Sequence, residues 1–450
     1  MTRRVNTLPG VVTLTLALLW TVAPAVAASL RVATFRSDAT PPAGEPLIWV
    51  TPVGKVEDPL WAKGIVIDDG ARRYVLCAID WCGVGSSTHR LFRGKMAAAA
   101  GTGISRVALH SVHQHAAPYI DGDGYRLLSK LPNPPLIMSD RYLEDVTNRL
   151  AAAIKEAAAR LEPFDQVGRG EARVERVAST RRVKAADGKI LVRYSSTAKT
   201  PELVAYPEEP IDPFLRTVTL ARAGRPLVRI HYYATHPQTF CCDGRVSGDF
   251  VSAAREAVER EQGVFQVYFT GCSGDVTVGK YNDGSTGARE QLAARLKKGL
   301  EASNASTRFA PAGPLRWTAV PLDLVARSDQ VMAAHRAFLA DPAKTPADEL
   351  YRSAIPVAFA ARKEPLEAVL LEIGPVRVLH LPGEPMLEFQ NYARGLNLGR
   401  FVVVAGYGDI SPGYLCTDKA YTEGGYEPSA SNVAPGTEAR VKEAIRKLLD

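Results

Sequence analysis

Long apolar segments are missing from most of the sequence. After the first 30 residues, no apolar run reaches the ~20 residues that a membrane-spanning helix needs. Internal repeats and low-complexity linkers are also missing. These absences predict one continuous domain over residues 28–450, without a transmembrane segment. The composition, with 46% hydrophobic and 23% charged residues, is that of an ordinary globular protein.

Cysteine is scarce, and its spacing excludes one kind of site. The six cysteines form no Cys-x-x-Cys pair, so a structural zinc ribbon is not expected. Cys241 and Cys242 are adjacent, and a bond between them would be strained. We therefore expect more distant partners for any disulfides.

An excess of positive charge is present, but it is small and scattered. The formal net charge is +7 over 450 residues. No nucleic-acid-binding motif accompanies it, so no nucleic-acid partner is expected. The excess is compatible with a peripheral contact at an anionic membrane surface.

The N-terminus has the pattern of a secretory signal. Arg3 and Arg4 precede the uncharged run Val11–Val22, and Ala25-Val26-Ala27 supplies small residues at a cleavage site. We predict a signal peptide over residues 1–27, with cleavage before Ala28, and a secreted or periplasmic protein. The alternative is an uncleaved anchor, but the apolar run is short and is interrupted near its ends by proline and glycine.

Short apolar runs, mostly β-branched or aromatic, alternate with amphipathic stretches. The predicted strands are Leu30–Phe35, Gly64–Asp68, Tyr74–Ile79, Arg106–His110, Thr217–Leu220, Leu227–Tyr233, Val264–Thr270, Ala368–Ile373, Val376–Leu381 and Phe401–Ala405. The predicted helices are a segment capped by Ser139 and ended by Pro163, then Val251–Glu261, Ala288–Leu300, Asp329–Leu339 and Thr437–Leu449. The mixture fits an α/β or an α+β protein. We predict an α/β fold with a mixed β-sheet core flanked by helices.

Potential metal ligands follow three of the predicted strands. His113 and His115 are two residues apart, so in an extended segment they face the same side. His236 follows the strand Leu227–Tyr233, and Glu384 follows Val376–Leu381. Each residue alone fits a structural role equally well or better. Together, two histidines and a carboxylate with an open position form a standard set of ligands for catalytic zinc.

Two glycine-containing stretches add polar groups near the same strand ends. Gly271-Cys272-Ser273-Gly274 lacks the Gly-x-Ser-x-Gly pattern, which excludes the nucleophile elbow of serine hydrolases. Asp275 and Thr277 follow in the same turn. The stretch from Gly406 to Glu427 is rich in tyrosine and glycine, which is typical of a binding loop.

These motifs together resemble the neutral/alkaline (non-lysosomal) ceramidases. The matching segments are His113-Gln114-His115-Ala116-Ala117-Pro118, Ala234-Thr235-His236-Pro237, Pro382-Gly383-Glu384, and Tyr414 with Tyr426 twelve residues later. Order and spacing agree from about Ala33 to Tyr426. The resemblance implies a hydrolase that cleaves the amide of an N-acyl (sphingo)lipid with a zinc-activated water.

The resemblance also implies roles for individual residues. The implied zinc ligands are His113, His236, Glu384 and Tyr414. His115 and Tyr426 would contact the scissile amide. Arg181 resembles the substrate-contacting arginine of the family, although neighbouring Arg182 is an alternative. As our own hypothesis of the mechanism, Asp275 orients a ligand histidine or acts as a base, and Thr277 binds a hydroxyl or carbonyl of the substrate.

The sequence departs from the family at two places. Thr277 stands where the family has a serine, and the following proline is missing. The C-terminal immunoglobulin-like domain of the family has no counterpart in the sequence. Two alternatives to a ceramidase-like enzyme therefore stay open. One is a zinc hydrolase of the same fold with a non-ceramide substrate, and the other is a non-catalytic secreted binding protein.

Overall fold

Three β-sheets form the centre of the computed structural model, which describes residues 1, 2, 4, 6, 30–396 and 399–450. The first sheet has the order β6-β4-β3-β1-β8 and consists of β1 (Arg31–Asp38), β3 (Trp61–Asp68), β4 (Arg73–Ile79), β6 (Val107–Ser111) and β8 (Glu162–Pro163). The second has the order β16-β14-β13-β9-β18 and consists of β9 (Gln166–Arg173), β13 (Phe214–Arg222), β14 (Arg225–Tyr233), β16 (Phe265–Thr270) and β18 (Arg308–Pro311). The third has the order β19-β20-β21-β23 and consists of β19 (Leu315–Leu322), β20 (Leu366–Ile373), β21 (Val376–His380) and β23 (Phe401–Ala405).

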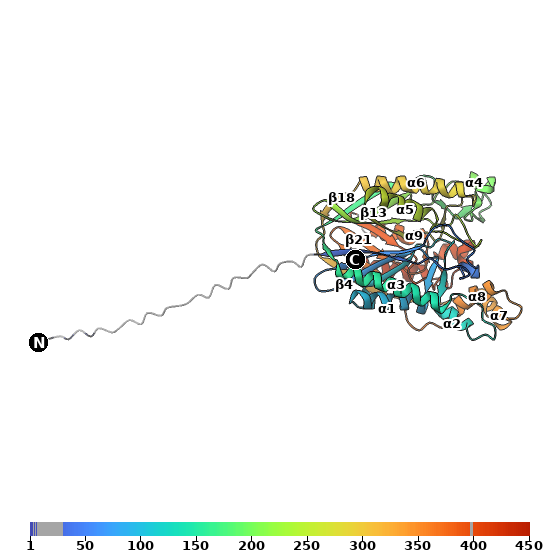
Figure 1. Cartoon of the computed structure of the whole chain (residues 1–450), viewed down its shortest axis with the longest axis horizontal. Helices are drawn as coiled ribbons and strands as arrows, with labels where there is room; N and C mark the ends of the chain where they lie inside the picture. The colour runs from blue at the N-terminus through green and yellow to red at the C-terminus, as the bar shows by residue number, and fades with distance from the viewer. Residues whose placement is uncertain (3, 5, 7–29, 397–398) are drawn as a thin grey trace.

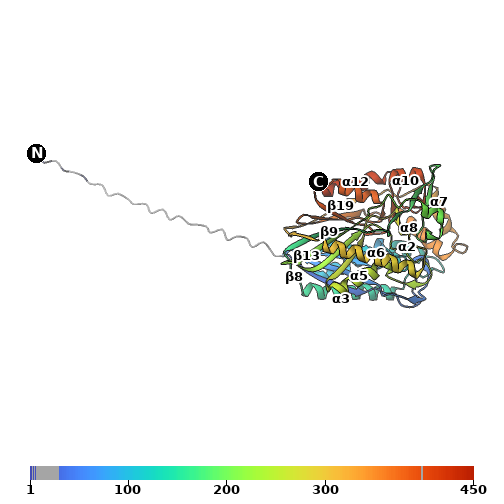
Figure 2. The same ribbon diagram turned by 90° about the horizontal axis from the view of Figure 1, so that it is seen from above.

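Helices cover the outer faces of the three sheets (Figures 1 and 2). The covering pairs are α1 (Ser86–Ala100) with α3 (Asp140–Ala159) on the first sheet, α5 (Asp249–Gln262) with α6 (Thr286–Ala305) on the second, and α9 (Leu387–Leu396) with α12 (Thr437–Leu449) on the third. Three further helices, α2 (Gly122–Leu128), α7 (Gln330–Ala340) and α8 (Ala347–Ala360), lie together at one end of the molecule. The predicted α/β fold with a mixed sheet core and flanking helices is confirmed.

The alternation of side chains along β4 explains how one strand joins two cores. Val75, Cys77 and Ile79 belong to the cluster that packs under α1 and α3. Leu76 and Ala78 point the other way, into a core shared with residues of the other two sheets. A strand buried on both faces reads as a continuous apolar run, which is why it was recognisable in the sequence. Each fully buried aliphatic side chain contributes roughly 1.5–3 kcal/mol to stability.

All ten predicted strands and all five predicted helices are present, with boundaries shifted by a few residues. The hydroxyl of Ser139 accepts a hydrogen bond from the N–H of Tyr142, as expected for a helix cap. Among the elements that the prediction missed are the strands β9 and β19 and the helices α1 and α8. The last of these contains Pro356, which normally ends a helix.

Three other expectations concern segments outside the sheets. The predicted signal peptide lies almost entirely outside the described residues. Among the residues that are described, no helix has both the length and the apolar character of a membrane span. The expectation of distant disulfide partners is wrong, because Cys241 pairs with Cys242. The turn that holds both cysteines brings their sulfurs together.

Candidate metal centre

Parallel strand pairs bring the predicted ligands to one edge of the sheets. β4 pairs with β6, β14 with β16, and β21 with β23, all in parallel. The segments that leave the carboxyl ends of β6, β14 and β21 carry His113, His236 and Glu384. Open α/β sheets usually build their sites at such ends.

The three side chains converge on one oxygen atom. The Nε2 atoms of His113 and His236 each lie 3.2 Å from Oε2 of Glu384. One ligand atom from each residue lies within 4.8 Å of the other two, and all three residues are buried. Two imidazoles and one carboxylate therefore point into the same small space.

Backbone carbonyls fix the tautomer of both histidines. The Nδ1 atom of His113 is 2.6 Å from the carbonyl oxygen of Cys82, and the Nδ1 atom of His236 is 2.7 Å from that of Ser273. Each Nδ1–H must donate to its carbonyl, which leaves a lone pair on Nε2 that faces Glu384. Nε2 of His113 has no hydrogen-bond partner despite its short distance to the carboxylate. Lone pairs that face one another in this way fit a cation better than a hydrogen bond.

The charge states also suit a cation. Burial lowers the pKa of His236 to about 3, so its imidazole is neutral near pH 7. Burial by itself would raise the pKa of Glu384, but positive charge at His113 and His236 holds it well below its ordinary value, and a cation held between the three residues would supply the same charge. A neutral imidazole and an ionised carboxylate are the forms that bind a metal. The residues present thus fit the predicted zinc ion.

A competing set of Cys82, His113 and His115 is a poorer metal site. Burial and the nearby charge of Glu384 raise the pKa of the Cys82 thiol, which disfavours the thiolate that binds metals. The sulfur of Cys82 approaches Nδ1 of His113, at 3.9 Å, but that nitrogen already donates to a carbonyl. The set of His113, His236 and Glu384 is therefore the better candidate for binding a metal.

Backbone pairing places Tyr414 beside this cluster. The two-residue strands β22 (Glu384–Pro385) and β24 (Tyr414–Leu415) pair in parallel, with Glu384 opposite Tyr414. Nη1 of Arg181 donates to the phenol oxygen of Tyr414 at 2.8 Å. Burial raises the pKa of Tyr414, and the charge of Arg181 opposes that rise. The role of Tyr414 as a fourth ligand stays a prediction.

His115 and Tyr426 line a cavity of about 380 Å³ that opens onto His113 and Glu384. The ring of His115 lies 5.8 Å from that of His236, and its Nδ1 atom lies 3.1 Å from the carbonyl oxygen of His113. Burial and neighbouring His113 lower the pKa of His115 well below its ordinary value. With Nδ1 directed at that carbonyl oxygen, Nε2 is the ring nitrogen of His115 left to exchange a proton.

The structure distinguishes Arg181 from Arg182. The guanidinium carbon of Arg181 lies 5.5 Å from the ring of Tyr426, and Arg181 lines the cavity. Arg182 turns away and donates to Glu427 at 2.8 Å. The arginine that faces the predicted site is therefore Arg181.

Asp275 and Thr277 lie deeper than the cavity wall. The proposed orientation of a ligand histidine by Asp275 is wrong, because carbonyls orient both histidines and Oδ1 of Asp275 accepts from the N–H of Leu387 at 2.8 Å. Thr277 is fully buried, and its hydroxyl accepts from the N–H of Gly279. Neither residue is among those that line the cavity. Their proposed catalytic and substrate-binding roles stay predictions.

Tyr407 supports the cluster and was not singled out as a site residue. Its ring stacks on that of His113 at 4.3 Å, and its hydroxyl lies 2.7 Å from that of Ser273. Both Tyr407 and His113 have positive φ angles, of 61° and 77°. Non-glycine residues in this conformation often mark functional sites. The signal in the sequence was the string Gly406-Tyr407-Gly408.

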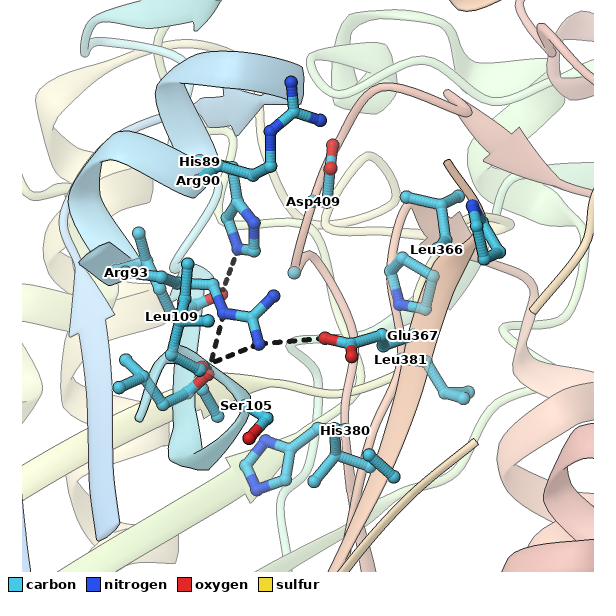
Figure 3. A pocket seen from close by; sticks show the side chains of 18 of the residues that line it. His89, Arg90, Arg93, Ser105, Leu109, Leu366, Glu367, His380, Leu381 and Asp409 are labelled. Carbon is cyan, nitrogen blue, oxygen red and sulfur yellow. Dashed lines mark hydrogen bonds and ion pairs between the residues drawn. The ribbon is translucent and has the colours of Figure 1, made fainter. Parts of the chain in front are cut away.

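A second cavity, of about 400 Å³, contains other histidines (Figure 3). It lies between α1 and the strands β20 and β21, with His89 and Arg93 on one side and Glu367 and His380 on the other. Nη2 of Arg93 donates to Glu367 at 2.9 Å across it. The acidic and basic groups here neutralise each other, and no described group of metal ligands gathers in this cavity.

The fold is similar to that of solved ceramidases. The neutral ceramidase from Pseudomonas aeruginosa superimposes with a TM-score of 0.70 at 17% sequence identity, over 94% of this chain and 74% of that one. A structure described as a ceramidase complexed with C2 superimposes with a TM-score of 0.69 at 16% sequence identity. That match covers 94% of this chain and 75% of the other. Neither a protein-family model nor a curated protein sequence matches. The predicted resemblance is confirmed at the level of the fold.

Proposed function

We propose that the protein is a zinc-dependent hydrolase of acyl amides. The observation that carries this proposal is the placement of two imidazole Nε2 atoms at 3.2 Å from one oxygen of Glu384. His113, His236 and Glu384 would hold the ion, with Tyr414 as the fourth ligand. Zinc in such a site lowers the pKa of a water molecule towards 7 and polarises a carbonyl group.

The residues around the cluster suit the remaining steps. His115 is positioned to move a proton between the water and the leaving nitrogen, because it lines the cavity and its ring lies 4.8 Å from that of His113. Tyr426 and Arg181 would donate hydrogen bonds to the oxyanion that forms from the carbonyl oxygen. One such donor contributes about 3 kcal/mol to the stabilisation of a transition state.

The finer parts of the proposal rest on the resemblance in sequence and fold. We propose an N-acyl compound as substrate, secretion or export to a periplasm, and a peripheral contact with membrane surfaces. Ceramide itself is one candidate substrate. A polar outer cavity wall, with Arg352 and Glu349 among its residues, favours the alternative of a non-ceramide amide.

Metal content and hydrolysis measured on the same preparation test the proposal. We expect about one zinc per chain and release of fatty acid from at least one member of a panel of N-acyl compounds. Chelation should abolish the activity and added zinc should restore it. A Glu384→Gln variant should bind little zinc and be inactive, whereas Glu388→Gln, on the exposed side of α9, should match the parent. A metal-free protein that hydrolyses amides would contradict the proposal, and a zinc-loaded protein inert to the whole panel would favour the non-catalytic alternative.

A further inference from the structure

One face of helix α8 forms part of the wall of the candidate cavity. Glu349, Arg352, Ile355 and Pro356 all line it. Their spacing of three and four residues places them on one side of the helix. Ile355 and Pro356 are apolar, and the charged pair lies one to two turns closer to the N-terminus of the helix. This face of α8 therefore presents an apolar stretch and a charged stretch to the cavity.

Arg352 is held in place without the use of its hydrogen-bond donors. Its guanidinium carbon lies 4.0 Å from the centre of the Trp49 ring. The short helix η1 (Ile48–Val50), which carries Trp49, packs against α8, and the ring of Trp49 lies 5.5 Å from that of Tyr119. A guanidinium stacked in this way has already lost part of its conformational freedom, so binding a ligand costs less entropy.

The N–H groups of Arg352 have no strong partner among the described residues. Its one ion pair is with Asp348, where Nε and Oδ2 are 3.8 Å apart. That Nε atom is buried and makes no hydrogen bond, while the side chain as a whole is 40% exposed. By contrast, Arg181 donates to Tyr414 and Arg362 to Asp409. Arg352 is thus an uncommitted cation on the wall of the cavity.

The other charged groups near Arg352 do not neutralise it by contact. Glu349 accepts a hydrogen bond from Ser353, and the described structure has no ion pair between Glu349 and Arg352. His335 also lines the cavity, and burial lowers its pKa, so it adds no positive charge near pH 7. The charge of Arg352 reaches into the site, because it opposes the rise that burial causes in the pKa of Tyr426.

We propose that Arg352 binds an anionic group of the substrate, so that the preferred substrates are acyl amides that carry a carboxylate or a phosphate. This inference rests on the proposed function, because it names the substrate class of the same cavity. A planar guanidinium with free donors pairs with both kinds of anion through two hydrogen bonds. An N-acyl amino acid supplies the carboxylate, and an N-acyl phosphoethanolamine supplies the phosphate.

Matched pairs of charged and uncharged substrates test the proposal. The carboxylate arm uses N-octanoyl derivatives of glycine, 4-aminobutyrate and 6-aminohexanoate, each compared with its N-methylamide. The phosphate arm compares N-octanoyl phosphoethanolamine with N-octanoyl ethanolamine. We expect kcat/KM to favour the charged member about tenfold in one arm, equivalent to about 1.4 kcal/mol. Arg352→Gln should reduce that preference to about one.

The matched control removes a positive charge from the neighbouring helix. Arg336 on α7 is exposed and outside the cavity, so Arg336→Gln should leave the preference for the charged substrate as it is in the parent. The proposal would be overturned if the parent shows no preference for the charged substrate, or if Arg352→Gln keeps that preference. It would also be overturned if the preference falls as much in Arg336→Gln as in Arg352→Gln. Circular dichroism and thermal melting check that each variant is folded.

A binding measurement separates this inference from the proposed function. In a Glu384→Gln background, calorimetry compares the affinity of the charged and uncharged amides with and without Arg352→Gln. If the parent hydrolyses no amide but the charged ligand still binds about tenfold more tightly through Arg352, the proposed function fails and the anion site stands. Equal affinities in all four cases overturn the anion site.

Discussion

Two groups of buried histidines lie at the strand ends, and they are built differently. In the candidate metal centre, His113 and His236 each donate from Nδ1 to a backbone carbonyl and direct Nε2 at Glu384. In the second cavity, Nδ1 of His110 lies 2.6 Å from the carbonyl oxygen of Gly406, and its Nε2 lies 2.9 Å from Nδ1 of His380. There the histidines bond to each other, and no described carboxylate forms an ion pair with either.

The difference shows that burial of histidines does not by itself make a metal site. Burial lowers the pKa of His110 and of His236 to about 3. His110 and His236 are therefore both neutral near pH 7. Only one group includes a carboxylate that faces the free nitrogens. A single loop makes the distinction, because it contributes Leu381 and Pro382 to the second cavity and Glu384 to the metal centre.

Substitution of one histidine in each group should give the largest difference, measured as zinc affinity. His236→Asn removes a proposed ligand, so we expect zinc affinity to fall by about 100-fold or more, as measured by competition with a chromogenic chelator. His380→Asn removes a histidine of equal burial from the other group and should leave zinc affinity unchanged. Comparable losses in the two variants would mean that the second group contributes to metal binding after all.

A smaller effect should separate the arginines of the two cavities. Arg181→Met removes a donor near the proposed oxyanion, and we expect kcat to fall about 10- to 100-fold, because one such donor contributes up to about 3 kcal/mol. Arg181 also donates to Tyr414, a proposed ligand, so zinc affinity should fall, but by less than in His236→Asn. The matched control is Arg90→Met in the second cavity, where the arginine pairs with Glu364 at 3.1 Å. A loss of zinc as large as that in His236→Asn would show that Arg181 acts through the metal centre and not on the oxyanion.

The smallest effect concerns stability at mildly acidic pH. Burial lowers the pKa of His89 to about 4, and an unfolded chain has a histidine pKa near 6.5. Between these values the unfolded state binds the proton and the folded state does not. Stability should therefore fall as pH falls from about 6.5 to 4, by about 1.4 kcal/mol per pH unit for such a group.

Urea unfolding at pH 7 and pH 5 measures this dependence. In His89→Gln the free energy of unfolding should fall less between pH 7 and pH 5 than in the parent, because one buried histidine no longer contributes to the pH dependence. The variant keeps a polar group near the carbonyl oxygen of Leu109, which Nε2 of His89 contacts at 3.1 Å. An unchanged pH dependence would show that His89 becomes protonated within the folded protein.

The sequence predicted the strands and the three best metal ligands for related physical reasons. A strand buried on both faces leaves a long apolar signature, and a polar residue just after it stands out. His113, His236 and Glu384 all follow such strands. The carbonyls that fix their tautomers leave no signature, because any residue can supply a carbonyl. For this reason the sequence does not reveal that the carbonyls of Cys82 and Ser273 orient the two histidines, and Asp275 is the orienting group that the sequence predicts.

The contact between Arg352 and Trp49 could not be predicted from the sequence, for a different reason. Trp49 lies in a three-residue helix with positive φ at two of its positions, and Arg352 lies in a helix interrupted by Pro356. About 300 residues of chain separate them. Only the packing of α8 against η1 brings the guanidinium onto the indole.

The two-residue pairing of β22 with β24 has a consequence for finding relatives at low sequence identity. Backbone hydrogen bonds from Glu384 to Gly413 and from Met386 to Leu415 set the register, and bonds between Gly383 and both Tyr407 and Asp409 fix the end of the intervening segment. Changes in chain length are therefore expected in the connection between α9 and β23, where they leave the glutamate beside the tyrosine. A search profile that anchors Pro-Gly-Glu-Pro, the strand Phe401–Ala405 and Gly-Tyr-Leu, with a free gap only before that strand, should recover distant homologues that fixed-spacing alignments overlook.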